Sequence, residues 1–177
     1  AQEGRKGPVW IDIPVDVQNM RVEPDELNHF RPDIVNPPTL SDDIIFILQS
    51  LTESKRPAIL IGSGIRSANV IDEFNDFVEK YNFPVAYTHS AADTFGTRNE
   101  LSIGAVGSMG GTRAGNFVVQ NSDLLLVLGS SLSTFTTGSE YHKFARDAKI
   151  IVVDIDEKEH TKNTVNVDKF IHLNLNS

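Results

Sequence analysis

A short loop near the middle of the chain has the residue types that could hold a phosphate. "LIGSGI", residues 60–65, places Gly62, Ser63 and Gly64 where an apolar run gives way to a helical pattern. Glycines there allow a close backbone approach, and the N–H groups at a helix start favour an anion. The full dinucleotide fingerprint needs a third glycine where Ser67 stands. A strand-to-helix turn that binds no ligand therefore stays open.

A second glycine-rich loop, "GAVGSMGGTRAGN" at residues 104–116, also leads into a predicted helix. Backbone N–H groups of such a loop can cradle a phosphate or pyrophosphate, so we predict cofactor contacts from Met109, Gly110, Gly111 and Thr112. The loop lacks the Lys-Ser/Thr ending of a nucleoside-triphosphatase loop, which excludes that class. The alternative is a tight crossover loop without a ligand.

Acidic residues follow an apolar strand in "VVDIDE", residues 152–157. A carboxylate at the end of a buried strand can accept hydrogen bonds from ribose hydroxyls, so Asp154 and the neighbouring Ile155 complete the predicted nucleotide site. The separation from the first glycine loop is far longer than the usual ~20 residues, so this acid belongs to a different strand. It could equally cap the following turn.

Other chemistries have little support. The chain has no cysteine, which excludes disulfides, thiolate zinc sites and a cysteine nucleophile. None of the histidines stands in a His-x-x-x-His pair, and no serine lies in a Gly-x-Ser-x-Gly elbow. We therefore predict neither a catalytic residue nor a metal ligand within this chain.

The elements that must position these loops alternate between short apolar strands and amphipathic helices from residue 41 onward. This alternation predicts an α/β domain with a Rossmann-like parallel sheet and helices on both faces. Residues 89–112 and 130–139 are expected to be mostly loop. The expected strands lie within 56–64, 83–88, 123–131, 149–157 and 169–177, and the expected helices begin at Ser41, Ser67, Thr112 and Ser139.

The first forty residues differ from the rest. Val9, Ile11 and Ile13 alternate with other residues, which predicts a strand over residues 8–14. Prolines interrupt residues 20–40, which we interpret as a linker. Residues 1–19 are then the end of a preceding domain, and residues 41–177 form the main domain.

Charge restricts the partners. The chain of 177 residues has a net charge of -8 with its lysines and arginines scattered, so neither nucleic acid nor an anionic membrane is an expected partner. No apolar run approaches the ~20 residues that span a bilayer. These features fit a cytoplasmic protein.

The order of the motifs resembles a known family. "GRKGPVWIDIPVDVQ" resembles the end of the pyrimidine-binding domain of thiamine-diphosphate-dependent enzymes of the acetolactate synthase type. "PAILIGSGI", "FPVAYT", "GAVGSMGGTRAGNFVVQNSDLLLVLGSSL" and "FARDAKIIVVDIDEKE" resemble their central Rossmann-like domain in order and spacing. The resemblance implies a transferase or lyase that decarboxylates a 2-oxo acid such as pyruvate, passes the carbanion to an acceptor, and works as a homodimer or homotetramer.

The resemblance also implies where the cofactors lie. Family members hold Mg²⁺ and thiamine diphosphate through a Gly-Asp-Gly motif, which does not occur in this chain. Both would bind outside these residues, and the chain alone is expected to be inactive. The central domain holds FAD in acetolactate synthases, ADP in oxalyl-CoA decarboxylases, and nothing in other relatives.

One stretch bears on FAD. Flavin-using relatives read Gly-x-Arg-Phe-Asp-Asp-Arg-x-Thr-Gly where this chain reads "GSSLSTFTTG", residues 129–138. Ser131 and Phe135 replace the two arginines and cannot supply a charge or a donor fork. Tight FAD binding is therefore not expected, and ADP binding stays open. Two alternatives also stay open: a stand-alone nucleotide-binding module of the sirtuin-like or transhydrogenase-like type, and a structural domain that binds nothing.

Overall fold

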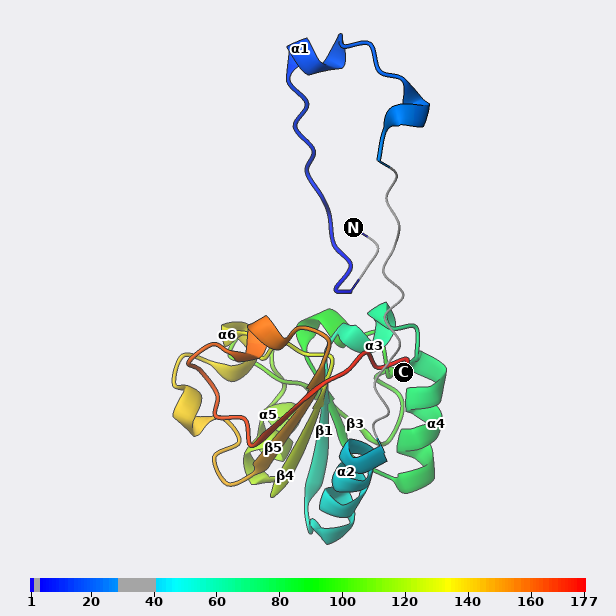
Figure 1. The fold of residues 1–177 in the computed structure, drawn as a ribbon. Coiled ribbons are helices and arrows are strands. Elements are labelled where there is room, and N and C mark those ends of the chain that lie inside the picture. Colours follow the sequence, from blue (N-terminus) through cyan, green and yellow to red (C-terminus); the bar gives the residue numbers. More distant parts are fainter. Residues whose placement is uncertain (2–3, 29–40) are drawn as a thin grey trace. The chain divides into compact units, whose positions relative to one another are not determined.

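A computed structural model describes residues 1, 4–28 and 41–177, and for Ser41 the backbone only. The chain divides into two compact units, Ala1–Pro38 and Thr39–Ser177, each considered by itself. Figure 1 shows both units. No described helix is long and apolar enough to cross a membrane.

The strand predicted over residues 8–14 is wrong. These residues are coil, followed by the short helix α1 (Val15–Gln18) and the 3-10 turn η1 (Pro24–Glu26). Trp10 is 91% exposed and Ile11 is 76% exposed. A strand needs a partner for its backbone groups, and the described residues of this unit contain no other strand to provide one.

The second unit confirms the parallel α/β fold. Its sheet has six strands in the order β3-β2-β1-β4-β5-β6, and every neighbouring pair is parallel. Order reverses between β1 and β4, the arrangement of a dinucleotide-binding sheet. The strands are β1 (Pro57–Ile61), β2 (Val85–Tyr87), β3 (Ser102–Ala105), β4 (Leu124–Leu128), β5 (Lys149–Asp154) and β6 (Lys169–His172).

Helices cover both faces of this sheet, because its central strands are apolar on both sides. Ile59 and Ile61 of β1 join one core cluster with residues of α2 (Ser41–Glu53) and α4 (Ile71–Tyr81). Leu60 joins the other cluster with Val119 of α5 (Arg113–Asn121). Figure 1 shows α2 and α4 on one side of the sheet and α5 on the other.

Several short elements differ from expectation. Strand β3 lies in the stretch expected to be loop, which also contains the 3-10 turn η2 (His89–Ala91). The helix expected from Ser139 is only the turn η3 (Tyr141–Lys143), because Ala145 has a φ of 45° that a right-handed helix cannot accommodate. The remaining short elements are α3 (Gly64–Ser67), α6 (Thr134–Thr137) and η4 (Glu157–His160).

Candidate functional site

The predicted site residues all follow the carboxyl ends of parallel strands, so the sheet brings them to one edge. Gly62, Ser63 and Gly64 follow β1, the loop from Met109 to Thr112 follows β3, and Asp154 ends β5. Ligands of such sheets bind at this edge, where the strand order reverses. The loop after β3 and Asp154 are not neighbours, because β2, β1 and β4 lie between their strands.

At the reversal point, the loop after β1 packs directly against the loop after β4. The N–H of Gly62 donates to the carbonyl of Leu128 over 2.9 Å, and the N–H of Gly64 donates to that of Gly129 over 3.0 Å. A Cβ on Gly62 would lie 2.7 Å from the Cα of Ser130. One on Gly129, which has a φ of +58°, would lie 2.6 Å from the Cα of Gly64. We call the packing of Gly62 and Gly64 on Gly129 the glycine contact.

The loops after β2 and β3 also meet. The Nε2 atom of His89 contacts the carbonyl oxygen of Met109 in a hydrogen bond. The His89 ring fills the space beside Gly110, where a Cβ would come within 3.0 Å of Nε2. Arg66 of α3 reaches the same region, where it pairs with Asp93 and donates to the carbonyl of Ser90 over 2.7 Å. Sequence reasoning gave His89 no role, because its partner lies twenty residues away.

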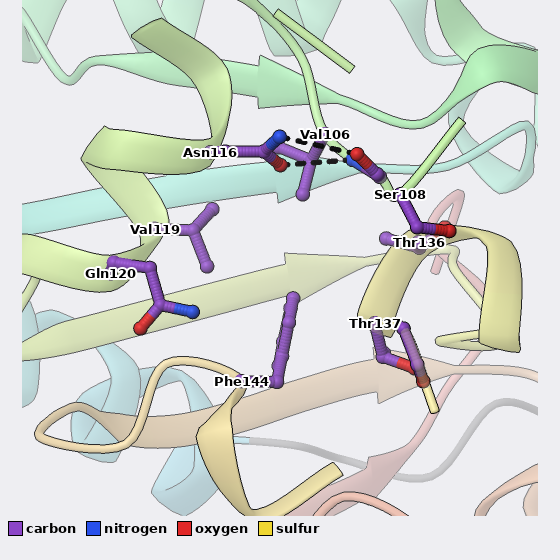
Figure 2. Close-up of a pocket in the computed structure, with 10 residues that line it drawn as sticks. Val106, Ser108, Asn116, Val119, Gln120, Thr136, Thr137 and Phe144 are labelled. Atoms are coloured by element: carbon purple, nitrogen blue, oxygen red, sulfur yellow. Dashed lines mark hydrogen bonds between the residues drawn. The ribbon is translucent and has the colours of Figure 1, made fainter. Parts of the chain in front are cut away.

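The glycine-rich loop after β3 is held by the first turn of α5. Thr112 is the N-cap: its hydroxyl oxygen accepts from the N–H of Gly115 over 2.9 Å, which confirms the predicted start of this helix. Asn116 holds Gly107 at two atoms, accepting from its N–H over 3.0 Å and donating to its carbonyl over 3.1 Å. Figure 2 shows this paired contact. The side chain of Asn116 thus fixes the path of the loop.

A pocket of about 200 Å³ lies between α5 and α6. Its walls carry no charged side chain, and none of the predicted site residues lines it. One wall of the pocket belongs to residues 129–138, the stretch whose sequence differs from that of flavin-using relatives. That difference is the sequence feature that points to this pocket. Its volume suits only a small group. Its lining is Val106, Gly107, Ser108, Asn116, Val119, Gln120, Thr136, Thr137, Gly138 and Phe144 (Figure 2).

Asp154 is a buried acid, with 8% of its surface exposed. Its Oδ1 accepts the N–H of Asp156 over 2.8 Å, so it caps the turn that follows β5. The carbonyl of Ile155 meets Nε2 of His172 at 2.9 Å. The carboxylate therefore makes the local contact that the sequence left open as an alternative to ribose binding.

His160 is the last residue of the 3-10 turn η4, which follows β5. Its ring stands 4.9 Å from that of Phe170. Burial lowers the pKa of His160, and the nearby Asp154 carboxylate opposes the shift. Within the described part of the chain, its buried Nε2 has no hydrogen-bond partner. These features favour a neutral ring packed in the structure rather than a proton carrier.

Two cations of the edge are paired with acids. Besides the Arg66–Asp93 pair, Lys162 contacts Glu159 at 2.6 Å and donates to the carbonyl of Ser131 over 3.2 Å. Among the described residues, no group of three or more acids and histidines could hold a metal ion. Arg66 and Lys162 are therefore committed to acids, whereas Arg113 at the start of α5 packs over the Phe117 ring, with its Cζ atom 5.3 Å from the ring centroid.

Comparison with known proteins defines the family. The family model described as "Thiamine pyrophosphate enzyme, central domain" matches residues 44–174. A probable acetolactate synthase large subunit from Methanococcus aeolicus is 38% identical over 95% of this chain and 28% of its own length. Acetolactate synthase 2, chloroplastic, from Nicotiana tabacum is 38% identical over 92% of this chain and 24% of its own length.

A bacterial acetolactate synthase is similar to this chain to nearly the same degree. The large subunit of acetolactate synthase isozyme 1 from Escherichia coli is 35% identical over 90% of this chain and 28% of its own length. The chain thus spans about a quarter of the length of the curated relatives that it matches. It belongs to the thiamine pyrophosphate enzyme family, and residues 44–174 are its central domain.

Proposed function

We propose that the protein containing this domain is an acetolactate-synthase-type enzyme. Such an enzyme releases CO₂ from a 2-oxo acid such as pyruvate and joins the remaining carbanion to the carbonyl carbon of an acceptor. The observation that carries the proposal is the match to acetolactate synthases over 95% of the chain, which includes residues before the central domain. A stand-alone nucleotide-binding module is not favoured, because that class gives no reason for this extended match.

The cofactors of this reaction do not fit the residues present. Bound thiamine diphosphate supplies a thiazolium that takes up the electron pair left by decarboxylation. This chain has no Gly-Asp-Gly motif, and its described residues gather no set of metal ligands. We therefore assign thiamine diphosphate and Mg²⁺ to other parts of the enzyme and assign the central domain a structural role.

The remaining assignments concern domain boundaries, assembly, location and nucleotide binding. We interpret residues 1–19 as the end of a preceding domain and residues 20–40 as a linker, in agreement with a family match that begins at residue 44. A homodimer or homotetramer and a cytoplasmic location stay predictions, and the tobacco relative is chloroplastic. The role of the predicted edge residues in holding a nucleotide also stays a prediction, supported by their common place at the sheet edge.

The test is an activity assay of the full-length enzyme. We expect the enzyme to release CO₂ from pyruvate and form acetolactate when thiamine diphosphate and Mg²⁺ are present. The 177-residue chain, assayed in parallel, should be inactive. A full-length enzyme that binds thiamine diphosphate but consumes no 2-oxo acid would contradict the proposal.

A further inference from the structure

We propose that the carboxyl edge of this central domain is closed to FAD and ADP, and that its glycines hold the loops to one another. The inference rests on the proposed function only for the choice of ligands, since relatives of this type hold FAD or ADP in this domain. It concerns what the edge binds, whereas the proposed function concerns the reaction of the whole enzyme.

The backbone donors at the reversal point are already used within the protein. A glycine loop holds a pyrophosphate through free N–H groups. At the reversal point, the N–H groups of Gly62 and Gly64 donate to the carbonyls of Leu128 and Gly129, and that of Gly129 donates to Val153 over 2.9 Å. A phosphate could gain these donors only if the loops after β1 and β4 separated from each other and from β5.

The space beside the glycines is filled by protein atoms. In a phosphate-binding loop, the lack of a Cβ atom on glycine leaves room for the ligand. In this domain, other protein atoms fill that room. The Cβ positions of Gly62 and Gly64 are occupied by backbone atoms of Gly129 and Ser130. The Cβ position of Gly110 is occupied by the His89 ring. The glycines are thus explained without a ligand.

The charges of the edge also bear on a pyrophosphate. Arginine forks strengthen the binding of a dinucleotide pyrophosphate. Arg66 is paired with Asp93, and Lys162 is paired with Glu159. Asp154 and Asp156 lie at the same edge. The positions that carry arginine in flavin-using relatives are Ser131 and Phe135 here, so they add no positive charge to this edge.

The first test is a ligand measurement on the full-length enzyme. The protein is incubated with excess FAD, desalted and examined for flavin absorbance, and it is titrated with FAD and with ADP by calorimetry. We expect no retained flavin and no binding heat for either ligand. One flavin or one ADP bound per chain would overturn the inference. Either result leaves the acetolactate assay independent, because that assay depends on thiamine diphosphate.

The second test asks what the glycines do in the absence of any ligand. Gly129→Ala and Gly96→Ala each place a side chain at a positive φ, +58° and +75°, but only the first would meet backbone atoms. We expect Gly129→Ala to lower the melting temperature of the ligand-free protein clearly more than Gly96→Ala does. Equal shifts would contradict the glycine contact.

A second pair covers the case in which Gly129→Ala fails to fold. Gly62→Ala and Gly7→Ala involve no positive φ, and only the substitution at position 62 would meet protein atoms. We expect the ligand-free Gly62→Ala protein to melt at a lower temperature than Gly7→Ala. Wild-type stability in Gly62→Ala would overturn the assignment.

Discussion

Asp123 joins the end of α2 to the start of β1. Its carboxylate accepts from the hydroxyl of Ser54 and from the N–H groups of Lys55 and Arg56, over 3.0 Å and 2.9 Å for the latter two. These hydrogen bonds, the Ser54 hydroxyl first, lower the pKa of Asp123 from 3.8 to about 2. The ionised form is therefore the one that the folded chain favours.

Replacing Asp123 should destabilise the protein in a pH-dependent way. Asp123→Ala should lower the free energy of unfolding at neutral pH by about 1–2 kcal/mol, because it removes a partly exposed, charged acceptor. A carboxyl with a lowered pKa stabilises above about pH 4 and loses this effect as pH falls toward about 2. Urea unfolding at several pH values measures the difference.

Asp147→Ala is the matched control, because Asp147 is largely exposed and forms a 3.8 Å surface pair with Arg146. It should change stability little at any pH. A loss from Asp123→Ala that stays constant down to pH 2 would contradict the role given to its charge.

His160 should act in the same direction along the pH scale as Asp123, but at higher pH. Burial lowers its pKa from 6.5, so the folded chain disfavours the charged ring. The unfolded state then binds the proton first, and stability falls as pH drops below about 6.5. His160→Gln should reduce this acid sensitivity between pH 7 and 5, measured by thermal unfolding. His142→Gln, at an exposed position, serves as the control, and an unchanged pH profile in His160→Gln would count against the buried ring.

Thr112 tests the start of α5. Thr112→Ala removes the hydroxyl that accepts from Gly115, and loss of an N-cap costs about 1 kcal/mol. Thr112→Ser keeps the hydroxyl and should stay close to wild type in the same denaturant titration. If both variants lower the free energy of unfolding equally, the methyl group of Thr112, rather than its capping hydroxyl, stabilises the protein.

At the scale of elements, the strands β1, β4 and β5 could be predicted because each is a continuous apolar run buried on both faces. Strand β3 could not, since Ser102–Ala105 contains a glycine and a single large apolar residue, Ile103. The pairing of β3 with β2 also shifts register. No local sequence pattern therefore predicts β3 as a strand.

Asn116 links two elements that sequence reasoning treated separately. Asn116→Ala should release Gly107, lower stability by about 1–2 kcal/mol, and speed hydrogen exchange at the Gly107 amide. Asn121→Ala, which removes a hydrogen bond to Phe117 within the same helix, should leave that amide protected. An unchanged exchange rate in Asn116→Ala would show that the loop is held by other contacts.

At the scale of the whole molecule, the residues of the predicted nucleotide site all lie at one edge of the sheet, because parallel strands direct all their carboxyl ends the same way. Their role in binding stays a prediction. It could not predict the partners that meet there. Gly129 lies far from Gly62 along the chain, and His89 lies far from Gly110, so their contacts exist only in the folded sheet. In the sequence, these glycines suggest a phosphate-binding site. In the fold, their contacts with other parts of the protein explain them.

The cofactor requirement of the full-length enzyme is the most direct test of the proposed function and of the closed edge. The full-length enzyme should be assayed with pyruvate while thiamine diphosphate, Mg²⁺ and FAD are omitted one at a time. We predict that acetolactate formation is lost without thiamine diphosphate or Mg²⁺ and is unchanged without FAD. Activity that persists without thiamine diphosphate would contradict the proposed function, and activity that requires FAD would contradict the closed edge of the central domain.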